Sequence, residues 1–139
     1  MSDSFDLQRF VDAQRPVFER VCAELRGGRK ASHWMWYIFP QMRGLGHSET
    51  SRRFAISSRL EAETYLKHPI LGPRLIECTR LVEQIEGRSA NQIFGSPDDL
   101  KFHSSMTLFA GVAKDDAIFT DVLRKYFKGE LDRATLEKL

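Results

Sequence analysis

Apolar residues recur every three or four positions along most of this chain, the spacing that places them on one face of an α-helix. Near the N-terminus this spacing predicts a short helix around Phe5–Val11. A second helix is predicted from Pro16, because proline is well tolerated at a first helical position. The second run ends at Gly27 and Gly28, which are typical of helix stops.

Further helix starts carry a capping-box pattern, in which a serine precedes by three residues a side chain that accepts hydrogen bonds. The serines are Ser58, Ser89 and Ser96. These serines predict helices over 58–67, 89–94 and 97–113. Apolar spacing predicts three more helices, over 71–86, 116–128 and 132–138, and Asp132 is expected to cap the last of them. Residues 48–57 are the least periodic, so we expect a loop there with at most a short extended piece.

No series of alternating apolar and polar residues indicates a β-sheet, and no linker or repeat divides the chain. The pattern therefore predicts an all-α fold, a single compact domain over 1–139 built from about seven short helices. A chain of 139 residues is long enough to bury a core of its own.

Composition changes this picture little. Lys and Arg total 21 against 19 Asp and Glu, and the basic residues are interleaved with acids, so we expect no nucleic-acid partner. No segment has the length or apolar character of a membrane span or a signal peptide, which predicts no membrane partner and a cytoplasmic location. Cys22 and Cys78 both fall in apolar helical runs and are expected to be free, buried thiols.

Candidate ligand-binding residues are most concentrated in and around the aromatic run WMWYIFP, residues 34–40. We interpret it as a short buried helix that Ser32 caps and Pro40 ends. A core role suits most of the run, but Trp34 and Trp36 cannot both point inward from one helix. Glycines and basic residues flank the run, which favours a ligand clamp with Lys30, Trp34, Trp36 and Gln41 as ligand-binding candidates.

A second group lies on the helix predicted over 97–113. Lys101, Ser104 and Ser105 are expected to share one helix face, and a lysine beside two hydroxyls can hold a phosphate or sugar hydroxyls. The alternative is a solvated face with an ordinary Asp98–Lys101 pair. If the first interpretation holds, Lys30, Trp36, Lys101 and Ser105 must meet at one cleft.

Candidates for catalysis are fewer. His33 and His103 are candidates for moving a proton, because imidazole gains and loses one near neutral pH. The four histidines are dispersed and no metal-binding spacing occurs, so the sequence predicts no metal and no cofactor.

Long stretches resemble the bacterial domain of unknown function 1810 family. They include DLQRFVDAQ, GRKASHWMWYIFPQMRGLGHS, EAETYLKHPILGPRLIECTRLV, IFGSPDDLKFHSSMTLF and FTDVLRKYFKGELDRATLEKL. This resemblance covers nearly the whole chain and implies a small, mainly helical single-domain protein. The resemblance does not imply a particular activity.

The order EA-x-x-Y-L, S-S-M-T-L-F and L-x-x-Y-F is more distantly similar to the NADAR superfamily. That similarity implies a nucleotide-like or ADP-ribose-like small molecule and, if the protein is an enzyme, hydrolysis of an N-glycosidic bond. Glu61 is then the candidate acid, beside His33 and His103.

Two functions remain open at this point. The first is binding or hydrolysis of such a molecule in an aromatic and basic cleft. The second is a protein-interaction module or homodimer without catalysis, in which a partner covers the aromatic run. The sequence leaves both a monomer and a homodimer possible.

Overall fold

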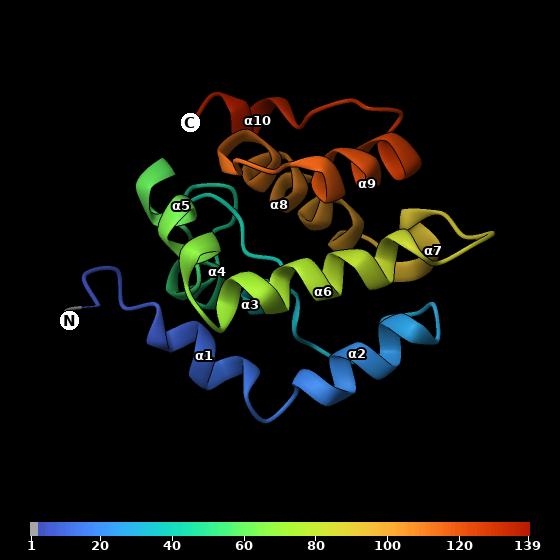
Figure 1. Cartoon of the computed structure of the whole chain (residues 1–139), viewed down its shortest axis with the longest axis horizontal. Coiled ribbons are helices and arrows are strands. Elements are labelled where there is room, and N and C mark those ends of the chain that lie inside the picture. The colour runs from blue at the N-terminus through green and yellow to red at the C-terminus, as the bar shows by residue number, and fades with distance from the viewer. Residues whose placement is uncertain (1–2) are drawn as a thin grey trace.

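The computed structural model describes residues 3–139, and within that range every regular element is a helix. Six of these helices have seven or more residues and four have only four or five. The all-α class predicted from the sequence is confirmed, with ten helices in the described range rather than about seven (Figure 1). The helices are α1 (Gln8–Gln14), α2 (Phe18–Arg26), α3 (Met35–Ile38), α4 (Glu49–Arg53), α5 (Arg59–Lys67), α6 (Leu71–Glu83), α7 (Ala90–Phe94), α8 (Asp98–Val112), α9 (Ala117–Phe127) and α10 (Arg133–Leu136).

Helix α8 is the centre of the fold. Helices α3, α5, α7, α9 and α10 all pack against it, while α2 reaches the rest of the core through α6 (Figure 1). Phe102, Met106 and Phe109, the predicted core face of α8, are fully buried. Because neighbours surround the helix, its buried side extends well beyond this face and takes in eight of its fifteen residues.

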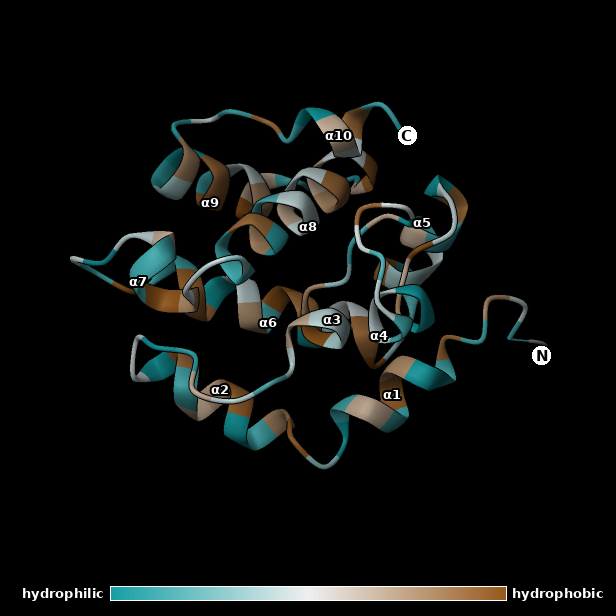
Figure 2. Cartoon of the chain, turned by 180° about the vertical axis from the view of Figure 1, so that it is seen from behind, coloured by the Kyte–Doolittle hydropathy of each residue, from teal (hydrophilic) through white to brown (hydrophobic). Residues whose placement is uncertain are grey.

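The aromatic run enters this core as the single-turn helix α3. Phe39 follows the turn and packs edge-on against Phe102 of α8, with ring centroids 4.9 Å apart. Phe94 of α7 stacks on the same Phe102 ring at 4.5 Å. These contacts hold Phe39 against α7 and α8, so the C-terminal end of α3 has a defined position. Seen from behind in Figure 2, α3 lies beside α4, below α8 and above α1, which it contacts.

Several helix starts predicted from the sequence are confirmed. The side chains of Ser58, Ser89 and Asp132 accept the backbone N–H groups of Glu61, Gln92 and Thr135 respectively. Ser89 and Gln92 complete a reciprocal capping box. Gly27 ends α2, and Gly28 has a φ of +82°, a left-handed conformation that favours glycine. Cys22 and Cys78 are buried and free, as expected.

Three local predictions were wrong. Ser96 does not cap α8, because the carbonyl of Gly95 accepts the N–H of Asp99 that the serine side chain would have taken. Ser32 does not cap α3, because its hydroxyl donates to a carboxylate on α2. The expected loop at 48–57 contains α4, which Ser48 caps.

The extended piece expected within 48–57 is reduced to one isolated parallel bridge, between Met42 and Ile56. This bridge joins the segment after α3 to the segment after α4. Between residues 3 and 139 no helix combines the length and the apolar composition that crossing a bilayer would require.

Candidate functional site

A carboxylate on α2 holds the segment that leads into α3. Glu24 accepts hydrogen bonds from the backbone N–H groups of Ala31 (2.7 Å) and Ser32 (3.1 Å), from the Ser32 hydroxyl (2.6 Å) and from the indole N–H of Trp34 (2.9 Å). Partial burial acts to raise the pKa of Glu24, but these hydrogen bonds outweigh it and hold that pKa below its usual value. The charged carboxylate therefore fixes both the backbone and the first tryptophan of the aromatic run.

Two lysines far apart in the sequence meet at one carboxylate beside this segment. The ammonium of Lys30 lies 2.9 Å from Asp98 Oδ2, and that of Lys101 lies 3.0 Å from Asp98 Oδ1. Partial burial acts to raise the pKa of Asp98, but the hydrogen bonds from the two lysines outweigh it and lower that pKa. Asp98 is therefore ionised at neutral pH, and the three side chains carry a net charge of +1. The exposed fractions of Lys30 and Asp98 are 8% and 18%, so solvent screens this group only partly.

Each lysine also lies over a tryptophan ring. Lys101 Nζ is 3.9 Å from the ring centroid of Trp36, and Lys30 Nζ is 5.2 Å from that of Trp34. Trp34 is 2% exposed and its N–H is bonded to Glu24, whereas Trp36 is only partly buried. Trp36 is therefore the more accessible of the two tryptophans.

These residues line a hollow of about 260 Å³, which we call the lysine hollow. Its lining residues are Lys30, His33, Trp34, Met35, Trp36, Tyr37, Thr50, Asp98 and Lys101. His33 is exposed, and its backbone carbonyl accepts the Tyr37 hydroxyl at 3.2 Å. The hollow thus combines an aromatic wall, an imidazole and a cationic group with one internal counter-ion.

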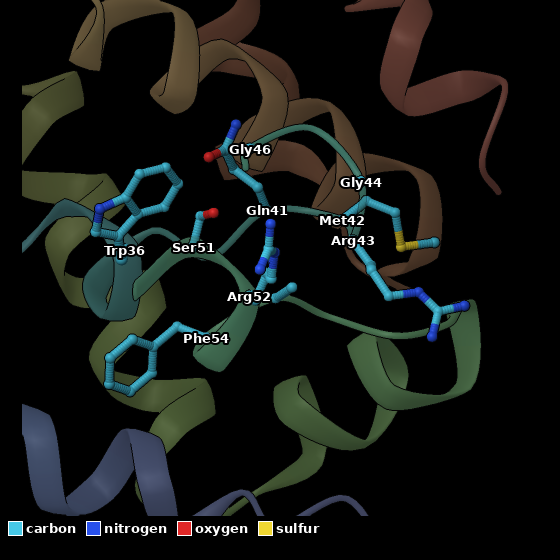
Figure 3. A pocket seen from close by; sticks show the side chains of 10 residues that line it. Trp36, Gln41, Met42, Arg43, Gly44, Gly46, Ser51, Arg52 and Phe54 are labelled. Carbon is cyan, nitrogen blue, oxygen red and sulfur yellow. The ribbon is translucent and has the colours of Figure 1, made fainter. Parts of the chain in front are cut away.

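Trp36 also lines a second hollow, of about 230 Å³, which we call the arginine hollow (Figure 3). Its lining residues are Trp36, Gln41, Met42, Arg43, Gly44, Gly46, Ser51, Arg52, Phe54 and Ala55. In Figure 3 the rings of Trp36 and Phe54 lie on one side and Met42 and Arg43 on the other. Helix α4 contributes to both hollows, with Thr50 in the first and Ser51 in the second. We refer to the two hollows together as the groove.

The structure therefore brings together part of the predicted site. The lysine hollow brings together Lys30, Trp36 and Lys101, and it is also lined by His33 and Trp34. The arginine hollow is lined by Gln41. The other four candidate residues, which are Glu61, His103, Ser104 and Ser105, line neither hollow.

Glu61 is 2% exposed and its carboxylate is occupied by local partners. Arg9 donates to Oε2 at 2.9 Å, and Ser57 donates to Oε1 through both its backbone N–H (2.9 Å) and its hydroxyl (2.6 Å). Arg9 also donates to the carbonyl of Ala55. Glu61 thus ties α1 to the start of α5 and the segment before it.

The remaining three candidates lie on sides of α8 that face other helices. His103 stacks on Phe127 of α9 with centroids 4.1 Å apart, and its Nε2 is 2.7 Å from the carbonyl of Glu130. Ser104 donates to Asp132, the residue that caps α10. Ser105 is fully buried, and its hydroxyl has no hydrogen-bond partner among the described residues. The predicted convergence of Ser105 with Lys101 was wrong, because that flank of α8 is packed rather than solvated.

Sequence reasoning missed Glu24, Thr50 and Arg43 as parts of the groove or its support. One weak indication in the sequence pointed to a structural role for Glu24. It is an acidic residue in the last turn of a helix, where the dipole disfavours negative charge. A carboxylate placed there needs donors from elsewhere, and the segment that returns after Gly28 supplies them. Arg43 lies in the basic flank that follows the aromatic run, from which only Gln41 was chosen as a candidate, and Thr50 had no comparable signal.

The chemistry of the lysine hollow is electrostatic and aromatic. Its carboxylate is ionised and bonded to two ammonium groups, so it is poorly suited to donate a proton. His33 is the imidazole at the rim. Within residues 3–139 no three His, Cys, Asp or Glu side chains gather in a way that would hold a metal ion.

Comparison with known proteins gives one family and one solved structure. The model of the family "Protein of unknown function (DUF1810)" matches residues 4–139. The crystal structure of the conserved hypothetical protein Rv1873 from Mycobacterium tuberculosis is similar to this chain at 56% sequence identity with a TM-score of 0.97. The match covers 99% of this chain and 98% of that one. No curated protein matches this sequence.

Proposed function

Since the chain belongs to the DUF1810 family, which is described only as proteins of unknown function, we propose its function from the groove itself. The protein binds a small molecule that carries a flat ring and an anionic group, of the nucleotide-like or ADP-ribose-like class. The observation that carries this proposal is Trp36, a partly exposed indole with an ammonium 3.9 Å above its ring and a second lysine on the same counter-ion.

The charges of the lysine hollow favour an anionic ligand. Lys30 and Lys101 share one carboxylate, so an excess positive charge lies next to the indole. A phosphate entering there gains charge-assisted hydrogen bonds from ammonium groups already held in place, which reduces the entropy lost on binding. An aromatic base gains edge contacts with Trp36, because Lys101 already lies over one face of that ring. A phosphate alone would use only the lysines of the hollow, and an aromatic base alone would use only Trp36.

Binding is supported better than catalysis. N-glycosidic hydrolysis needs an acid or base at the reacting bond, and Glu61 and His103 are engaged elsewhere in the fold. His33 is the candidate that lines the hollow. If the protein is a hydrolase, His33 is therefore the residue to test first.

The interaction-module alternative has less support. It requires the aromatic run to form an exposed patch, yet Trp34, Met35, Ile38 and Phe39 are each no more than 3% exposed. The large exposed apolar side chains are on other segments, for example Leu60, Leu100 and Leu131.

Thermal unfolding with AMP and with ADP-ribose tests the proposal. A ligand present at 100 times its Kd stabilises the native state by about 2.7 kcal/mol, so the unfolding midpoint of the wild type should rise. Lys101→Ala removes one of the two cations and should reduce this rise strongly. Lys114→Ala, which neutralises an exposed lysine outside the groove, should leave it unchanged.

Two results would count against the proposal. One is a wild-type midpoint that neither compound raises at millimolar concentration. The other is an equal rise in Lys101→Ala and in the wild type, which would place binding away from the lysine hollow.

A further inference from the structure

The arginine hollow adjoins the lysine hollow at Trp36 and has a different electrostatic character. In the lysine hollow both cations share Asp98. Arg43 and Arg52 of the arginine hollow are exposed, and neither forms an ion pair with any acidic residue in the described part of the chain. Two cations without a counter-ion therefore lie at the rim of a cavity whose walls include Trp36, Met42 and Phe54.

The two arginines belong to segments that are fixed relative to each other. The backbone N–H of Arg43 donates to the carbonyl of Ile56, and the N–H of Ile56 donates to the carbonyl of Gln41, both at 2.8 Å. This bridge ties the segment carrying Arg43 to the residues just after α4, the helix that carries Arg52. The backbones that carry both guanidinium groups are therefore held in place.

The loop between them packs directly on the shared tryptophan. A Cβ added at Gly46 would lie 3.2 Å from Trp36 Cη2 and 2.8 Å from the Ser51 side chain. The backbone at Gly46 thus reaches the edge of the indole with no room for a side chain. Trp36 is consequently enclosed by this loop on one side and by Lys101 on the other, and it separates the two hollows.

The volumes indicate how much of the groove one ligand must use. The hollows measure about 260 and 230 Å³, and each is smaller than the roughly 300 Å³ at the lower end for small-molecule sites. A ligand with two linked groups fills both, whereas a single small group leaves one empty.

Resting on the proposed function, we infer that the ligand is bipartite and carries two separate anionic groups. One anionic group lies at Lys30 and Lys101, and a second lies across Trp36 at Arg43 and Arg52, where a guanidinium can hold a phosphate through two parallel hydrogen bonds. The chemical class is a nucleoside bisphosphate, with its two phosphates on different positions of the sugar, because the two phosphorus atoms of a diphosphate share one bridging oxygen and are too close to lie on opposite sides of an indole. A nucleoside monophosphate occupies the lysine hollow alone.

The test measures the Kd of AMP and of adenosine 3′,5′-bisphosphate for the wild type, Arg43→Gln, Arg52→Gln and Arg53→Gln. Arg53 is the matched control, because it follows Arg52 in the same helix but does not line the hollow. The wild type should bind adenosine 3′,5′-bisphosphate more tightly than AMP by about tenfold or more, as expected for one added hydrogen-bonded charge pair. Arg43→Gln and Arg52→Gln should remove most of that difference, because they weaken binding of the bisphosphate much more than binding of AMP. Arg53→Gln should change neither value appreciably.

The remaining outcomes separate two kinds of failure. The bipartite ligand is overturned, with the proposed function intact, if the wild type binds both compounds equally well. The same holds if Arg43→Gln and Arg52→Gln behave like Arg53→Gln, or weaken both compounds to the same extent. If the wild type binds neither compound, the proposed function and this inference fail together.

Discussion

Replacing Glu24 with alanine should lower the free energy of unfolding by about 3 kcal/mol, because hydrogen bonds to a charged acceptor contribute about 1.5–3 kcal/mol and a buried donor left unpaired carries its own cost. Glu24 accepts four hydrogen bonds, and one of them comes from the indole of Trp34, which is 2% exposed. Removing the carboxylate frees the segment 31–34, so ligand binding at the groove should weaken as well. Urea unfolding followed by circular dichroism measures the stability change.

Glu19→Ala is the matched control for this effect. Glu19 is exposed in the first turn of the same helix, where its charge interacts only with the helix dipole, and its loss should cost a few tenths of a kcal/mol, within the roughly 0.3–1 kcal/mol of such interactions. Equal stability of the two variants would show that the Glu24 cluster does not support the fold.

The Glu24 contribution should also depend on pH. The folded-state pKa of Glu24 is lowered from 4.5, so its stabilisation is fully present above the unfolded pKa and is lost as the pH falls through the lower, folded value. Glu24→Gln cannot lose a charge and should therefore show a shallower decrease in stability on acidification. Parallel acid titrations of the wild type and Glu24→Gln would contradict this assignment.

Gly72→Ala should destabilise the protein by about 2–3 kcal/mol, the cost of forcing extra atoms into a packed region. Alanine normally stabilises a helix relative to glycine by about 0.5–1 kcal/mol. At this position a Cβ would lie only 2.1 Å from the carbonyl oxygen of Leu66, a backbone atom of α5. Helices α5 and α6 would have to separate, and this outweighs the gain in helix propensity.

Gly111→Ala is the matched control for the destabilisation expected of Gly72→Ala. Gly111 lies inside α8, and a Cβ there would meet only the side-chain end of Leu139, at 3.2 Å near the C-terminus. This variant should be neutral or slightly more stable in the same urea experiment. A Gly72→Ala variant as stable as Gly111→Ala would mean that the close approach of α5 and α6 relaxes without cost.

Short-range signals account for what could be predicted of the fold. The caps at Ser58, Ser89 and Asp132 depend on residues three positions apart, and the structure has all three. Helix α4 was missed because its five residues have no apolar periodicity, and its cap at Ser48 was the only local signal. Ser96 failed as a cap because a backbone carbonyl accepts the same N–H group, an outcome that depends on the path of the preceding chain.

Those parts of the site that depend on residue type could be predicted from the sequence. The parts that depend on how the helices pack could not. Aromatic and basic side chains around Trp36 and Lys101 indicated a groove, and these residues do meet. Ser105 faces the core because α8 has helices on several sides, and the sequence of α8 alone does not specify how many neighbours it has. Glu24 was missed for a related reason, since its partners lie beyond a glycine turn whose direction the sequence leaves open.

The groove is tested most directly by the two tryptophan indole N–H signals in a ¹⁵N–¹H correlation spectrum. The chain has two tryptophans, so Trp36→Phe assigns both signals by removing one. On titration with ADP-ribose, the Trp36 signal should shift and saturate, while the Trp34 signal, whose N–H is bonded to Glu24, should move much less. Indole signals that both stay fixed to millimolar ligand, or a shift confined to Trp34, would contradict a ligand site at Trp36.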